Sequence, residues 1–71
     1  MRIMERIIKA AGGQSELARQ LDIRQQSVYE WVLRGRVPAE RVLEVERITG
    51  VSRHEIRPDL YPLERVASAR F

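Results

Sequence analysis

Residues 14–36 hold the feature that most restricts how this chain can fold. Apolar residues recur there at helical spacing in two short runs, and a three-residue break at residues 22–24 separates the runs. Two short helices joined by a turn of this length predict a helix-turn-helix. The apolar positions are Leu17, Ala18 and Leu21 before the break, and Val28, Trp31 and Val32 after it.

Individual residues meet the steric demands of that motif. Two helices that cross closely need a small residue in the first of them, and Ala18 stands in its middle. The turn needs an apolar residue after the bend, which is Ile23, and a residue that tolerates positive φ. Aspartate visits this left-handed region more readily than most side chains, so Asp22 suits the turn. The predicted motif core is Leu17, Ala18, Leu21, Ile23, Val28 and Trp31.

Three further short helices are expected outside the motif. The apolar residues of 3–11 follow one helix face, and Gly12 and Gly13 end that helix. A fourth helix is expected to have Pro38 in its first position and to end at Gly50. No segment alternates in the manner of a strand. With a fifth helix after Gly50, the predicted fold class is all-α with five short helices.

The fifth helix is marked by the letters "SRHE" at residues 52–55. This spacing predicts a capping box, in which Ser52 caps the helix and Glu55 reaches back to it. Pro58 is expected to stop the helix, because the residue before a proline is pushed out of the helical region. The lone histidine, His54, is expected to be exposed in the first turn.

Past Pro58 the apolar pattern weakens, and this change sets the expected domain boundary. We place a helix-turn-helix domain at residues 1–58 and a C-terminal arm or tail at residues 59–71. Three conformations fit the second segment: an extended arm docked on the domain, a short helix over residues 63–69, or a frayed end.

The composition excludes several classes of protein. Seventy-one residues make one domain with a small core, and without cysteine there is no disulfide or thiolate chemistry. One histidine with no cysteine argues against a metal site, and no catalytic constellation of side chains stands out. We expect neither an enzyme nor a cofactor or small-molecule ligand. No apolar run approaches the ~20 residues of a membrane span, and charges interrupt the first residues, so no signal peptide is expected and the expected location is cytoplasmic.

The chain carries a net charge of +3, from 13 Lys and Arg against 10 Asp and Glu. All but one of these cations are arginine, whose planar fork suits phosphates and guanine edges. GC-rich coding DNA explains the arginine content equally well. Residues 14–41 hold five arginines against four acidic residues, a net of only +1, so binding to a polyanion would depend on where the arginines lie.

The second helix of the motif is the expected reading element, because in a helix-turn-helix its N-terminal residues meet base edges in the major groove. Glutamine pairs with two adenine atoms, and glutamate accepts from cytosine N4. Simple solvation of an exposed helix start is the alternative. The predicted base contacts are Gln25, Gln26, Ser27, Tyr29 and Glu30.

Phosphate contacts are expected from arginine side chains and from backbone N–H groups at helix starts. Arg34 and Arg36 flank Gly35 just after the second motif helix, where a DNA strand would pass. Generic surface charge is the alternative for all of these arginines. The predicted phosphate contacts are Arg19, Arg24, Arg34, Arg36 and Arg41.

Residues 14–36 resemble the helix-turn-helix of phage Cro and repressor proteins, which have the lambda-repressor-like fold. The stretch "RGRVPAERVLEVERITGVSRHEIRPDLYP", residues 34–62, resembles more narrowly the Cro-like regulators of bacterial prophages, including the YdaS group. The resemblance implies an all-α domain that binds double-stranded operator DNA, usually as a dimer, and represses transcription.

The resemblance adds one contact and shows two departures. In the family, a glutamine at the position of Gln14 contacts a phosphate and braces a glutamine at the position of Gln25; a helix-start glutamine with no partner is the alternative. Asp22 replaces the family's usual turn glycine. Arg24 stands where the family has a Ser or Thr cap, whose loss costs about 0.5–2 kcal/mol. A phosphate contact by Arg24 would compensate.

The expected function is repression by a weak homodimer on a two-fold operator. A YdaS-like antitoxin that regulates its own operon is one alternative, and a protein-interaction module that has lost DNA binding is another. The dimer surface is expected past the reading helix, unless the apolar residues there fold back onto the chain, as we expect for Ile56, Leu60 and Tyr61. The candidate residues for the dimer surface are Val51, Ile56, Leu60, Tyr61, Leu63, Val66 and Phe71.

Overall fold

A computed structural model describes residues 2–62, and every regular element over these residues is a helix or a 3-10 turn. This confirms the predicted all-α class with five short helices. The predictions for Leu63, Val66 and Phe71, and the possible helix over 63–69, lie outside the described residues. The elements are α1 (Ile3–Ala11), α2 (Gln14–Leu21), α3 (Gln25–Arg34), the 3-10 turn η1 (Ala39–Arg41), α4 (Val42–Thr49) and α5 (Arg53–Ile56).

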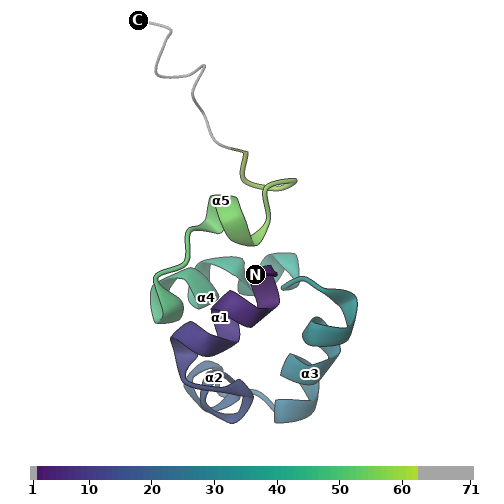
Figure 1. Cartoon of the computed structure of the whole chain (residues 1–71), viewed down its shortest axis with the longest axis vertical. Coiled ribbons are helices and arrows are strands. Elements are labelled where there is room, and N and C mark those ends of the chain that lie inside the picture. The colour runs from purple at the N-terminus through teal and green to yellow at the C-terminus, as the bar shows by residue number, and fades with distance from the viewer. Residues whose placement is uncertain (1, 63–71) are drawn as a thin grey trace, which may run out of the picture.

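The helices surround one apolar core (Figure 1). Helix α1 packs against both α2 and α4, α2 packs against α3, and α5 packs on α4. Each element except η1 contributes at least one buried side chain, and the connection after α3 contributes Val37. The core side chains are Met4, Ile7, Ala11, Leu17, Ala18, Leu21, Val28, Trp31, Val37, Val42, Val45, Val51 and Ile56. A core of this size is consistent with a small domain that is only modestly stable.

Local signals start α1 and end α3. The Glu5 carboxylate accepts a hydrogen bond from the Arg2 backbone N–H at 2.9 Å, which satisfies one of the unpaired donors at the start of α1. Gly35 ends α3 in the left-handed conformation, with a φ of 80°. The Arg36 N–H then donates to the Trp31 carbonyl at 3.1 Å, so the chain closes α3 with a Schellman motif.

The fourth helix begins differently from the prediction. Pro38 has a ψ of 152°, so it lies before the helix in extended conformation rather than in its first position. Its carbonyl accepts from the Arg41 N–H at 3.0 Å, which forms a 3-10 turn. The regular α-helix starts only at Val42. The prediction of a helix ending at Gly50 was correct.

The predicted capping box of α5 is half wrong. The Ser52 hydroxyl oxygen does cap the helix, accepting from the His54 N–H at 3.1 Å. The Glu55 carboxylate, however, forms an ion pair with Arg6 and so ties α5 to α1. His54 is half-buried rather than exposed, because its ring Nδ1 lies 2.8 Å from the Tyr61 carbonyl oxygen.

Helix α5 and the segment after it fold back onto the domain only in part. Ile56 is buried and Tyr61 packs against the core, as expected. Leu60 is 44% exposed, so the expectation that it folds back is wrong. It lies in the turn that follows α5, where its N–H donates to the Arg57 carbonyl. No helix within the described residues is long and apolar enough to cross a membrane.

Candidate nucleic-acid interface

The bend between α2 and α3 is built on Asp22. Its φ of 59° and ψ of 46° are left-handed, as the sequence predicted for this position. The Ile23 N–H donates to the Ala18 carbonyl at 3.0 Å, and the Asp22 N–H donates to the Arg19 carbonyl at 3.2 Å. This pair of bonds is a Schellman motif, and Ile23 packs against the core just past it.

We expect Asp22→Gly to raise the free energy of unfolding by about 0.5–1 kcal/mol, because glycine adopts positive φ without a Cβ penalty. In a domain of this size, about 1 kcal/mol corresponds to a shift of roughly 4–8 °C in Tm. Thermal denaturation followed by circular dichroism measures the shift. Alanine at the same position keeps the Cβ and should leave the Tm at or below the native value. A higher Tm for Asp22→Ala than for Asp22→Gly would contradict this account of the turn.

Packing between α2 and α3 sets which face of α3 is exposed. Leu17, Ala18 and Leu21 of α2 are buried together with Val28 and Trp31 of α3. Trp31 is only 5% exposed, which confirms the interpretation that it belongs to the core. With these two α3 residues held against α2, the opposite face of α3 is turned away from the domain.

Four of the five predicted base-contact residues are exposed on α3: Gln25, Gln26, Tyr29 and Glu30. The remaining one, Ser27, is half-buried. The structure adds Leu33, which is 67% exposed and lies two helical turns after Gln26, and therefore on the same face. Sequence reasoning missed Leu33, although its seven-residue separation from Gln26 was a usable signal.

The N-terminus of α3 has no side-chain cap. Arg24 occupies the cap position in extended conformation, and its side chain makes no capping hydrogen bond. The first turn of α3 contains no acidic residue. The backbone N–H groups and the positive end of the helix dipole therefore have no anionic side chain of α3 beside them.

The predicted phosphate-contact arginines fall into two groups. Arg19 is ion-paired with Glu16, and Arg41 is paired with Glu44 at 2.9 Å. Among the residues that the structure describes, no ion pair involves Arg24, Arg34 or Arg36, which are all exposed. These three lie at the two ends of α3, so they flank its exposed face. The hydrogen bonds from Arg19 also lower the pKa of Glu16.

Gln14 is the first residue of α2 and is half-buried. Within residues 2–62 no hydrogen bond joins its side chain to Gln25. Contact of Gln14 with a phosphate remains a prediction.

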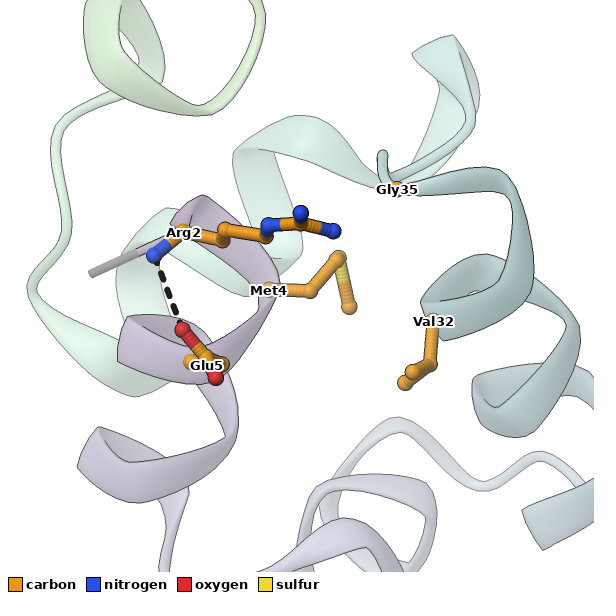
Figure 2. A pocket seen from close by; sticks show the side chains of 5 residues that line it. All are labelled: Arg2, Met4, Glu5, Val32 and Gly35. Carbon is orange, nitrogen blue, oxygen red and sulfur yellow. Dashed lines mark hydrogen bonds between the residues drawn. The ribbon is translucent and has the colours of Figure 1, made fainter.

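Arg2 is a further cation near this region that sequence reasoning missed. It lines a hollow of about 230 Å³ together with Met4, Glu5, Val32 and Gly35. Figure 2 shows the Arg2 side chain reaching across the start of α1 towards Gly35. Although Arg2 is distant from Arg36 in sequence, it therefore adds a positive charge beside the connection that carries Arg36.

Arg57 is a third residue that the sequence did not single out. Its guanidinium donates to the Val37 carbonyl at 2.8 Å and to the two carboxylate oxygens of Asp59 at 3.0 and 2.8 Å. The hydrogen bonds from Arg57 lower the pKa of Asp59 to about 2, and the charge of Arg36 contributes a smaller effect in the same direction. Twenty residues separate Arg57 from Val37, so no local pattern could have revealed the contact.

Comparisons with known proteins agree with this geometry. A family model described as bacterial toxin YdaS matches residues 4–64. Among solved structures, the Cro protein from the prophage element Xfaso 1 of Xylella fastidiosa strain Ann-1 matches with a TM-score of 0.83 and 40% sequence identity. That match covers 89% of this chain and 100% of the Cro chain. A search among curated proteins returned no match.

Proposed function

Because this chain belongs to the YdaS family of Cro-like prophage regulators, we propose that it is a sequence-specific DNA-binding repressor. The observation that supports this most is the exposed polar face of α3, flanked at its two ends by Arg24, Arg34 and Arg36. The Cro-like fold and the family match point to a regulatory protein rather than an enzyme. We expect it to act in the cytoplasm, on double-stranded DNA.

In the proposed complex, α3 enters the major groove and its N-terminal residues meet the bases. Gln25 and Gln26 are exposed at this end, and glutamine pairs bidentately with adenine N6 and N7. Tyr29 and Glu30 lie one turn further on, within the same exposed surface. Ser27, being half-buried, is the member of the set with least freedom to reach a base.

The proposed phosphate contacts hold α3 in register. Arg34 and Arg36 lie at the C-terminal end of α3, Arg24 lies at its start, and none of the three is committed to a carboxylate within residues 2–62. Arg19 and Arg41 would first have to leave Glu16 and Glu44, so we expect them to contribute less. Contacts to phosphates set orientation and do not carry sequence information directly.

One short module reads few base pairs, so specificity is expected to come from two half-sites. In helix-turn-helix dimers these lie one DNA turn apart, about 34 Å. We propose a weak homodimer that forms mainly on the operator and excludes RNA polymerase by covering the promoter. Among the predicted dimer residues within residues 2–62, Leu60 is the one whose side chain is exposed, so we propose it for such a contact.

Selection from a random pool of duplex oligonucleotides, followed by sequencing of the retained DNA, tests the proposed function. The expected result is enrichment of a two-fold motif whose half-sites are about 10 base pairs apart, centre to centre. No enrichment would favour the alternative of a protein-interaction module and would refute the repressor. The same experiment supplies the operator sequence for every test below.

A YdaS-like antitoxin that regulates its own operon remains a second candidate, since the family match is compatible with it. It shares the DNA-binding mechanism and differs in its genetic setting. A neighbouring toxin-like gene would favour this candidate, and a divergently transcribed repressor gene would favour the Cro-type role.

We expect Arg36→Ala to weaken binding to all DNA sequences alike. Loss of one phosphate contact should reduce the slope of log affinity against log salt by about one. Binding titrations over a salt series measure this slope. Arg47→Ala is the matched control, because Arg47 is an exposed arginine on α4 that the proposed interface does not include. An unaltered slope for Arg36→Ala would remove Arg36 from the phosphate contacts.

A further inference from the structure

The connection between α3 and η1, residues 35–38, is tied down at one carbonyl. The Val37 side chain is fully buried, and the Val37 carbonyl accepts a hydrogen bond from the Arg57 guanidinium at 2.8 Å. The neighbouring residue, Arg36, is exposed. Two interactions therefore hold the backbone at Val37: its side chain is packed in the core, and its carbonyl accepts from the charged Arg57 side chain.

Arg57 is itself held in place. The Nε and Nη2 atoms of Arg57 donate to the Asp59 carboxylate, and its Nη1 donates to the Val37 carbonyl. Three nitrogens of one planar guanidinium are therefore used. The Arg57 side chain is only 12% exposed, whereas that of Asp59 is 54% exposed. A pair with so exposed a carboxylate adds little to stability by itself. The geometry of the fork, in contrast, strongly fixes the direction of the remaining donor.

We propose that Arg57 is a positioning residue, which with Asp59 clamps residues 35–38 so that Arg36 is presented to a DNA phosphate. This inference rests on the proposed function and adds a residue to it that does not itself contact DNA. The Arg36 charge also acts on the Asp59 carboxylate, which is consistent with Arg36 lying on the same side of the domain as the clamp. Because the clamp orders this loop in the free protein, DNA binding does not include the entropic cost of ordering it.

The test is a double-mutant cycle with Arg57→Lys and Arg36→Ala, measured on the operator over a salt series. Lysine keeps the charge and the apolar stem but has no planar fork. Arg57→Lys should lower affinity roughly fivefold to tenfold near physiological salt and reduce the salt slope by about one, as expected for one lost phosphate contact. In the Arg36→Ala background it should have almost no further effect, because the two changes remove the same contact.

The readout separates positioning from simple loss of stability. A less stable protein has a smaller folded fraction, but each folded molecule still makes the same number of phosphate contacts, so its salt slope does not change. Arg53→Lys is the matched control: Arg53 also pairs with a carboxylate, that of Glu46 on α4, and has no hydrogen bond to residues 35–38. It should leave both the affinity and the slope unchanged.

Three results would overturn the clamp. The Arg57→Lys protein could bind with native affinity and slope, or its loss of affinity could persist in full in the Arg36→Ala background. The third result needs no variant: in the native protein, backbone order parameters for residues 35–37 below about 0.6 would show a flexible loop, whereas a clamped loop should approach about 0.85. If the native protein binds duplex DNA and any of these results is found, only the clamp fails. If it binds no duplex at all, the proposed function fails with it.

Discussion

Replacing Leu17 by alanine is expected to lower the free energy of unfolding by about 2–5 kcal/mol. The Leu17 side chain is 0% exposed and lies in the apolar cluster shared by α2 and α3. The change removes transfer free energy and leaves a cavity that close-packed neighbours fill only in part. A 71-residue domain has a total stability of about 4–10 kcal/mol, so this single change should remove a large share of that stability.

Chemical denaturation followed by circular dichroism measures this loss, and the fluorescence of the buried Trp31 offers a second probe. Leu33→Ala is the matched control, because it is the same chemical change at a side chain that is 67% exposed. It should alter stability by no more than about 0.5 kcal/mol. Similar losses for the two leucine variants would show that the described packing of α2 on α3 is wrong.

Replacing Gln26 by alanine is expected to reduce the discrimination between bases at one operator position by about 1–3 kcal/mol, with little change in Tm. The side chain is exposed on α3, so its removal opens no cavity, but it would remove both hydrogen bonds to an adenine edge. Affinity for the operator with the preferred base should fall until it is close to the affinities for operators with the other three bases.

Competition binding with operators substituted at each position measures this loss of preference. Gln20→Ala is the control, because Gln20 is also an exposed glutamine but lies on α2, where its amide donates to Glu16 at 2.9 Å. It should leave the preference at every position intact. If Gln26→Ala also preserves every preference, Gln26 takes no part in reading the bases.

The helical framework was predictable because its signals are local. Apolar residues three and four positions apart place side chains on one helix face, and glycine or aspartate in left-handed conformation ends a helix. The ends of α1, α2, α3 and α4 follow from Gly12, Asp22, Gly35 and Gly50, which all have positive φ. The core residues of the motif followed from the same spacing, and all of them are buried or packed against the core.

The candidate interface was predictable only in part, since exposure and charge pairing depend on neighbours in space. The sequence favoured Arg34 and Arg36 by their position, but it could not show that Arg19 and Arg41 are paired with carboxylates of the same helical region. Ser27 was grouped with Gln25 and Gln26, although it is half-buried. Leu33 was overlooked although its separation from Gln26 places it on the same helix face, and the packing of α3 shows that this face is turned outward.

The sequence by itself determined where α1 to α4 end, which side chains form the core of the motif, and that Asp22 makes the turn. Those properties depend on residues at most a few positions apart, so steric rules and helical periodicity suffice. Only the tertiary structure decided that Glu55 pairs with Arg6 and that Arg57 reaches Val37, because these partners are 49 and 20 residues apart and meet only when the helices pack. The same packing decides how firmly the loop carrying Arg36 is held beside the exposed face of α3.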